Sequence, residues 1–126
     1  MRTHCADFAR QHDLDIRFNA DEALTPLSRD VAVCVYRVLQ EGLRNIANHA
    51  GVREARVSLT QTPELIELLI VDRGRGFDPD AGAARRGLGL LSIEERARLV
   101  GGIVKITSTP DRGTALHVKV PARAAS

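Results

Sequence analysis

The feature that most constrains this chain is an apolar run that ends in a carboxylate and two closely spaced glycines. Leu68 to Val71 are apolar, and Asp72 follows them directly. An unbroken apolar run is typical of a buried strand. An aspartate at its end lies at the edge of the core, where it needs a hydrogen-bond partner such as the amino group of a ligand. Gly74 and Gly76 then allow a sharp turn and a close backbone approach. By local pattern alone, an ordinary strand that ends in an Asp-Gly turn is the simpler interpretation.

Length and composition describe a single ordinary domain. The chain has 126 residues, 44% apolar and 27% charged, which suits a soluble globular protein with a real core. A formal net charge of +2 is too small to indicate nucleic acid or a membrane surface as a partner. No apolar run is long enough to cross a bilayer, and the N-terminus lacks the order of a signal peptide. Cys5 and Cys34 fit no metal-binding spacing, and the valines around Cys34 predict a buried free thiol in a reducing, cytoplasmic setting.

The first half of the chain predicts a short helix, a strand and a long helix. Residues 3–12 fit a helix, residues 13–18 alternate between polar and apolar as in a strand, and residues 21–26 are a connector. Thr25 or Ser28 can cap the next helix, with Pro26 near its start. That helix is expected to run to about Ala50, where Gly51 ends it. Its apolar face is predicted by helical spacing: Val35, Leu39, Leu43, Ile46 and Ala50.

The second half predicts four strands and a helix. Residues 55–60 and 65–72 fit a hairpin, in which Asp72 shares the inward face with Ile66, Leu68 and Ile70. Residues 78–86 read as a loop, a helix follows and ends at Gly101 and Gly102, and residues 103–108 and 114–120 are the last strands. We therefore expect an α+β two-layer sandwich with a mixed, mostly antiparallel sheet and helices on one face. It forms one domain over residues 1–126, with residues 121–126 as a frayed tail.

Three polar residues of the long helix are spaced four apart. Glu41, Asn45 and His49 stack on one face, beside the apolar stripe and hence at the rim of the core. A carboxylate and an amide oxygen one turn apart suit Mg²⁺ and its water, and the carboxylate can also act as a general base. A solvated helix edge is the plain alternative.

Together with this helix, two glycine-containing segments carry a resemblance. Asp72 to Phe77 follow a strand, and Gly87-Leu88-Gly89-Leu90 opens a helix. In this order and spacing, the sequence resembles the ATPase domain of histidine kinases, within the superfamily shared by gyrase, heat-shock chaperone ATPases and mismatch-repair ATPases. It looks nearest to the sensor kinases paired with helix-turn-helix response regulators. The resemblance runs from about Leu14 to Pro121 and implies a Bergerat-type ATP-binding fold. A Walker-type phosphate loop is absent from the sequence.

The resemblance implies ATP and Mg²⁺ as cofactors and assigns roles to particular residues. Asn45 would hold Mg²⁺ against the triphosphate, and Glu41 would act as the base or orient the accepting nucleophile. Asp72 would accept a hydrogen bond from the adenine amino group, with Thr114 near the base. The two glycine-containing segments would supply the rest of the site. The adenine pocket would be shaped by Gly74, Gly76 and Phe77. The phosphates would be approached by Gly87, Leu88, Gly89 and Leu90. Residues 78–86 would form the lid over ATP.

One departure from the subfamily lies in the helix. Asn48 stands where the subfamily usually has a lysine, just before His49. A lysine there would help to neutralise phosphate charge, so its absence affects the expected strength of triphosphate binding. As a hypothesis, His49 or one of three arginines compensates: Arg53, Arg85 or Arg86.

A histidine kinase also needs a phosphoacceptor histidine. His12-Asp13 resembles the acceptor dipeptide but leads directly into a strand, with no room for a dimerisation hairpin, and His4 and His117 fit no better. We therefore expect an excised catalytic domain whose partners are the dimerisation and phosphoacceptor domain of the same kinase and a response regulator receiver domain, with no direct nucleic-acid contact. The isolated domain is expected to be monomeric and the intact kinase dimeric, either cytoplasmic or as the cytoplasmic part of a membrane-anchored protein.

Two other readings stay open at this stage. One is a stand-alone serine kinase of the anti-sigma type, which shares the fold and would need no upstream histidine. The segment Glu94-Glu95-Arg96, which follows Gly87-Leu88-Gly89-Leu90 closely, looks more like the sensor kinases. The other is a degenerate domain that binds a nucleotide or a partner without catalysis. Asn48 supports that reading, whereas the presence of Glu41 and Asn45 argues against it.

Overall fold

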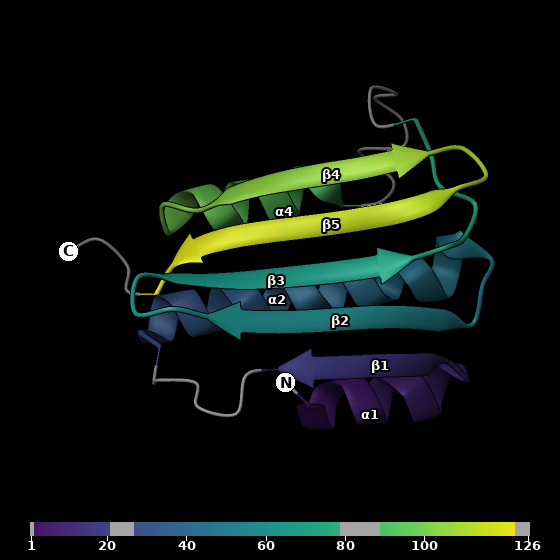
Figure 1. Cartoon of the computed structure of the whole chain (residues 1–126), viewed down its shortest axis with the longest axis horizontal. Coiled ribbons are helices and arrows are strands. Elements are labelled where there is room, and N and C mark those ends of the chain that lie inside the picture. The colour runs from purple at the N-terminus through teal and green to yellow at the C-terminus, as the bar shows by residue number, and fades with distance from the viewer. Residues whose placement is uncertain (1, 21–26, 79–88, 123–126) are drawn as a thin grey trace.

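The computed structural model describes residues 2–20, 27–78 and 89–122. In Figure 1 these residues form two layers, with the helices packed against the sheet. The elements follow one another as α1 (Arg2–His12), β1 (Asp15–Ala20), α2 (Arg29–Asn45), the π-helical turn η1 (Ile46–Ala50), β2 (Glu54–Gln61), β3 (Leu65–Asp72), α4 (Leu90–Leu99), β4 (Ile103–Thr109) and β5 (Gly113–Pro121). No helix in the described ranges is long and apolar enough to span a membrane.

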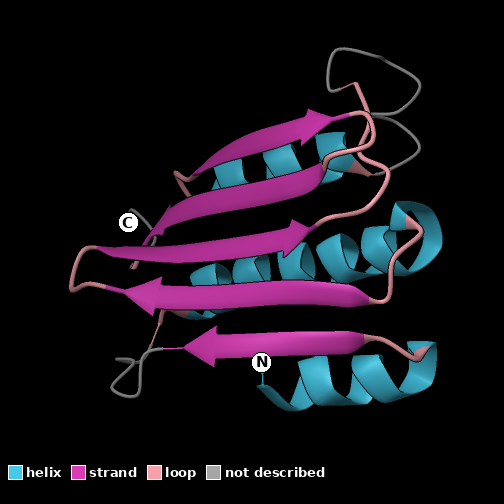
Figure 2. Ribbon diagram, turned by 45° about the vertical axis from the view of Figure 1, so that its right-hand side comes forward, coloured by secondary structure: helices cyan, strands magenta, loops and turns pink. Residues whose placement is uncertain are grey.

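The sheet has five strands in the order β1-β2-β3-β5-β4. The neighbours β2 and β3, β3 and β5, and β4 and β5 are antiparallel, whereas β1 and β2 are parallel. The parallel pair requires a crossover, and α2 lies in the segment that makes it. Figure 2 shows the described helices together on one side of the sheet. The predicted α+β sandwich with a mixed, mostly antiparallel sheet is therefore confirmed.

The core lies between α2, α4 and the inward face of the sheet. On β3 the alternation predicted from the sequence is present, since Ile66, Leu68, Ile70 and Asp72 are all buried. Ser28 caps α2 by accepting a hydrogen bond from the Val31 amide at 3.4 Å. Thr25, the other predicted cap, lies outside the described residues. The inward residues of α2 and η1 include Val31, Cys34, Val35, Val38, Leu39, Leu43, Ile46 and Ala50.

The structure differs from the sequence prediction at two places. The long helix changes from α to π geometry at Ile46, one residue after Asn45, although the spacing predicted one continuous α-helix. Such turns recur at functional sites. The C-terminal prediction is wrong for two residues, because Pro121 ends β5 and Ala122 is buried with its amide bonded to the Glu64 carbonyl at 2.9 Å. Of the predicted loop 78–86, only Asp78 lies within the described residues.

Candidate functional site

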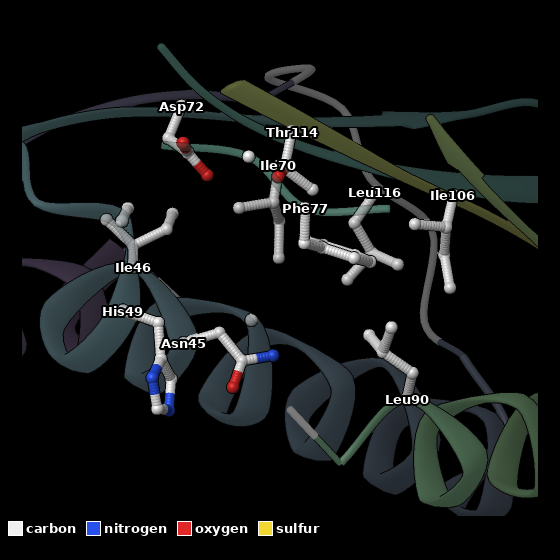
Figure 3. A pocket seen from close by; sticks show the side chains of 13 residues that line it. Asn45, Ile46, His49, Ile70, Asp72, Phe77, Leu90, Ile106, Thr114 and Leu116 are labelled. Carbon is white, nitrogen blue, oxygen red and sulfur yellow. The ribbon is translucent and has the colours of Figure 1, made fainter. Parts of the chain in front are cut away.

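A cavity of about 300 Å³ opens between the C-terminal part of the long helix and the ends of β3 and β5. Figure 3 shows Asp72 on the sheet side of this cavity and Asn45 and His49 on the helix side, with apolar side chains between them. This arrangement brings together residues from the long helix, from β3 and the segment after it, and from α4, β4 and β5. The described residues that line it are Gly42, Asn45, Ile46, His49, Ala50, Ile70, Asp72, Gly76, Phe77, Leu90, Ile106, Thr114 and Leu116.

Asp72 is a buried carboxylate with limited internal support. It ends β3 on the inward face, and its Oδ1 accepts a hydrogen bond from the Gly74 amide at 2.8 Å. Among the described residues, no second group donates to this carboxylate. Burial raises the pKa of the Asp72 carboxyl, and the Gly74 hydrogen bond acts in the opposite direction. The second carboxylate oxygen is therefore available to a hydrogen-bond donor in the cavity.

Ser108 organises the sheet side of the cavity, and the sequence analysis did not identify it. Its Oγ accepts a hydrogen bond from the Phe77 amide at 2.9 Å, and it lies 2.8 Å from Thr114 Oγ1 and 3.1 Å from the Gly113 carbonyl oxygen. Ser108 thereby fixes two residues that line the cavity, Phe77 and Thr114. The only sequence signal for it is a small polar residue at an inward position of a strand, which is common and carries little information.

The glycine segment after Asp72 passes between two other parts of the backbone. Gly76 has a φ of +61°, and a Cβ at this position would collide with the Thr109 carbonyl. Next to it, the Arg75 amide donates to the Ala50 carbonyl at 2.8 Å. The segment is therefore held against both η1 and the β4–β5 turn, which places Gly76 and Phe77 on the cavity wall, while Gly74 lies just outside the lining.

The three polar residues predicted to share one face of the long helix do not all line the cavity. Asn45 and His49 line the cavity, but Glu41 does not. Glu41 lies beside Gly89, the residue before α4, and forms an ion pair with Arg44 at 3.3 Å. Gly89 has a φ of +67°, and no side chain of a described residue caps the helix that follows it. Glu41 thus stands where the first turn of α4 meets α2, at one margin of the cavity rather than on its wall.

Of the remaining predicted positions, Asn48 and Arg53 are described, and neither lines the cavity. Asn48 is exposed and is not part of the lining. Arg53 forms an ion pair with Asp13 at 2.7 Å and does not line the cavity, so the hypothesis that it compensates for Asn48 is not supported. The other candidates lie outside the described residues: Arg85, Arg86, Gly87 and Leu88. Within the described ranges, no group of three or more His, Cys, Asp or Glu side chains could hold a metal ion.

Most of the cavity wall is apolar, and besides Phe77 and Leu90, which the resemblance assigns to the nucleotide site, it contains residues predicted only to face the core. The periodicity did place Ile46, Ala50 and Ile70 on inward faces, but it could not show that they border an open space. Leu116, Ile106 and Gly42 also contribute to this surface. Gly42 is needed for close packing, because a Cβ there would lie 2.6 Å from Ile70 Cδ1. The result is an apolar slot with a single buried carboxylate at one end.

A sequence comparison decides the family. Residues 30–124 match the family described as "Histidine kinase-, DNA gyrase B-, and HSP90-like ATPase". The chain belongs to this family. The match covers most of the chain, including every described element that lines the cavity, so the cavity lies within the part of the chain that matches the ATPase family.

Solved structures give the same fold for this ATPase domain. The histidine kinase domain of the Erythrobacter litoralis EL346 blue-light activated histidine kinase has a TM-score of 0.75 and 19% identity, over 96% of this chain and 58% of that one. The catalytic domain of histidine kinase ThkA has a TM-score of 0.76 and 14% identity, over 97% and 87%. Acinetobacter baumannii histidine kinase AdeS has a TM-score of 0.72 and 17% identity, over 95% and 60%. The resemblance to histidine kinase catalytic domains is confirmed at the level of fold.

This chain spans 58% of the length of the first of these relatives, and 40% of a longer chain of the same Erythrobacter litoralis kinase. Those structures therefore contain further segments beyond the ATPase domain.

Proposed function

We propose that this ATPase domain is the kinase-catalytic domain of a two-component sensor histidine kinase, of the subfamily whose response regulators carry a helix-turn-helix output. It would transfer the γ-phosphoryl group of ATP to a histidine on the dimerisation domain of the same kinase. That histidine would then pass the phosphoryl group to a receiver domain. The observation that carries this proposal is that Asp72 and Asn45 lie on opposite walls of one cavity in a chain of this family.

Adenine recognition would depend on Asp72. The slot of about 300 Å³ is at the lower end of the range for ligand pockets and is mostly apolar, which suits a planar base. The free oxygen of Asp72 would accept a hydrogen bond from the adenine amino group. Gly76, Phe77 and Thr114 would flank the base, because all three line the cavity. Burial of the carboxylate makes this hydrogen bond strong and penalises its absence.

The residues at the cavity fit a magnesium ion whose ligands are mostly water and phosphate oxygens rather than protein atoms. Asn45 offers one amide oxygen at the cavity, and no multi-residue metal cage exists in the described ranges. Mg²⁺ commonly binds with few protein ligands and with phosphate oxygens and water as the others. When bound, it would neutralise charge on the triphosphate. The chain's own contribution would be to orient that ion through Asn45.

Phosphates and the accepting histidine would meet near the start of α4. Among the described residues, no side chain caps this helix, and its first amides would bind an anion. Glu41 lies beside Gly89 at the same place and would orient or deprotonate the accepting imidazole. His49, on the cavity wall, would add a donor to the phosphates. Phosphoryl transfer requires mainly positioning and charge neutralisation, which these groups supply. As a catalytic domain of this kind, the chain would act in the cytoplasm.

The test is phosphotransfer in trans. This chain, Mg²⁺ and labelled ATP would be mixed with the separately produced dimerisation domain of the same kinase. We expect label on that domain that is stable to base and lost in acid, as for phosphohistidine. Glu41→Gln should slow transfer by about a hundredfold or more while retaining ATP-analogue affinity. Asp30→Asn, an exposed carboxylate in the first turn of the same helix, is the matched control.

Two results would contradict the proposal. Acid-stable label on a serine would favour the anti-sigma type of kinase. Absence of any transfer by a protein that binds the ATP analogue would favour a domain that binds nucleotide without catalysis.

A further inference from the structure

Three polar side chains form a row across the sheet beside the cavity. Asp72 of β3 is paired in register with Thr114 of β5, and Thr114 is paired in register with Ser108 of β4. Directly opposed residues have their Cβ atoms about 5 Å apart, so side chains of neighbours can touch. Thr114 therefore stands between a carboxylate and a hydroxyl. Its single hydroxyl hydrogen can serve only one of them at a time.

The contacts of Ser108 decide which neighbour receives this hydrogen. The Phe77 amide can only donate to Ser108 Oγ, at 2.9 Å, and the Gly113 carbonyl can only accept from it, at 3.1 Å. Ser108 has one hydrogen, and in this arrangement it goes to Gly113. The third contact, at 2.8 Å from Thr114 Oγ1, is then a hydrogen bond only if Thr114 donates. All three contacts are satisfied together in this one arrangement.

This arrangement leaves Asp72 without a hydrogen bond from its neighbour on β5. Among the described residues, only the Gly74 amide donates to the carboxylate. A buried carboxylate gains from a second donor, so a released Thr114 hydroxyl would turn toward it. Such a hydrogen bond would occupy the oxygen that a ligand's amino group needs.

We propose that Ser108 is a specificity-determining residue for the nucleotide: by taking the hydroxyl hydrogen of Thr114, it keeps Asp72 free to accept a hydrogen bond from the amino group of the base. The inference rests on the proposed ATP-binding role of the cavity and deepens it. Ser108 is a positioning residue, since it is not part of the cavity lining and acts through Thr114.

The experiment compares two nucleotides that differ only in the amino group. One is a non-hydrolysable ATP analogue, and the other is the matching analogue of purine riboside triphosphate, which lacks that group. The wild-type protein should prefer the first. Ser108→Ala should reduce this preference about tenfold through loss of the ATP analogue's affinity alone, because a hydrogen bond to a charged group is lost. A change in packing would lower both affinities, so the ratio isolates the effect on Asp72.

Removal of the Thr114 hydroxyl supplies the matched control. Thr114→Val is expected to weaken both nucleotides alike and to keep the amino preference. In that background, Ser108→Ala should no longer change the preference, because no hydroxyl is left to turn toward Asp72. This control also tests the inference if the single Ser108 variant does not fold, since a preference that rises in Thr114→Val would mean that Thr114 already donates to Asp72.

The possible failures are distinguishable. A wild-type protein that binds neither nucleotide would overturn the proposed function and this inference with it. A wild-type protein that prefers the amino nucleotide, together with a folded Ser108→Ala variant of unchanged preference, would overturn the role of Ser108 alone. Equal losses for both nucleotides in Ser108→Ala would also overturn it, because they would indicate a purely structural residue.

Discussion

The amide of Arg75 donates to the carbonyl of Ala50 at 2.8 Å, and this hydrogen bond ties the segment after Asp72 to the end of the helix that carries Asn45. Two segments separated by more than twenty residues in sequence are thereby joined directly through their backbones. Because both ends of the contact are main-chain atoms, the spacing between the sheet side and the helix side of the cavity does not depend on flexible side chains.

The first prediction concerns Asp72 and the stability of the domain. Burial raises the native pKa of this carboxyl above its ordinary value of 3.8. The native state therefore retains a proton at pH values where the unfolded chain has already lost it. The resulting contribution to stability is fully present below pH 3.8 and is lost as the pH rises through the native pKa. Asp72→Asn should remove this loss and keep the Oδ1 acceptor for Gly74, so the variant should be at least as stable as wild type at neutral pH.

Urea denaturation near pH 4 and at neutral pH checks this prediction. The difference in the free energy of unfolding between variant and wild type should move in favour of the variant as the pH rises. A variant that becomes relatively less stable toward neutral pH would show that the charged carboxylate stabilises the fold and is not held for a ligand.

The second prediction concerns the contact between Gly89 and Glu41. Gly89 and Gly101 both have positive φ, at +67° and +78°. A Cβ at Gly89 would collide with Glu41 Oε1, whereas the nearest atom to a Cβ at Gly101 is Pro121 Cγ at 3.7 Å. Gly101→Ala should therefore lower the free energy of unfolding only by the cost of a left-handed backbone conformation, about 1–2 kcal/mol. Gly89→Ala should have the same backbone cost and should displace the Glu41 side chain as well.

Denaturation of both alanine variants measures the stability cost, and phosphotransfer measures the position of Glu41. We expect a loss of transfer in the Gly89 variant that exceeds its loss of stability, and no such excess in the Gly101 variant. Equal behaviour of the two variants would mean that the position of Glu41 beside Gly89 has no functional weight.

The third prediction concerns Asn48, where the subfamily usually has a lysine. Asn48 is exposed at the end of the long helix, one residue before the cavity residue His49. Asn48→Lys should increase affinity for a triphosphate about fivefold at low salt, because an exposed charge contributes on the order of 1 kcal/mol. The gain should shrink at high salt. Asn19→Lys, exposed on β1, is the matched control and should give no gain. A gain of the same size from both variants would mean that only net charge matters.

The fourth prediction tests the packing of the helix layer through the cysteines. Cys5 and Cys34 are free and only 2% and 5% exposed. Burial raises the pKa of the Cys5 thiol to about 11 and raises that of Cys34, whose Sγ lies 3.5 Å from the Arg96 carbonyl. Both thiols should resist iodoacetamide in the native protein and react fully in urea. Rapid native labelling of Cys5 alone would indicate that α1 does not pack as described.

The sequence predicted the structure best where a local residue pattern is compatible with only one arrangement of the chain. The alternation along β3 predicts that Asp72 faces inward with Ile70, and the structure agrees. The hairpin of β2 and β3 and the Ser28 cap follow from equally local signals. The carboxylate, the glycines and the helix asparagine could be named in advance because each residue type has a restricted chemistry.

Other features depend on contacts that a single sequence does not encode locally. The parallel pairing of β1 with β2 results from the crossover through α2, so no pattern within β1 reveals it. The π-helical turn after Asn45 keeps Ile46 and Ala50 buried, as an α-helix would, and the spacing does not separate the two. Ser108 was missed because its importance comes from three partners on other segments.

The most direct test of the account is the affinity of an ATP analogue, measured by calorimetry with and without Mg²⁺ for wild type, Asp72→Asn and Asn45→Ala. We expect the Asp72 variant to lose at least tenfold in affinity under both conditions, because a hydrogen bond to a buried charge is removed. The Asn45 variant should bind like wild type without Mg²⁺ and lose the enhancement that Mg²⁺ gives. Unchanged affinity in both folded variants would contradict the account, because the nucleotide would then not occupy the cavity between these two residues.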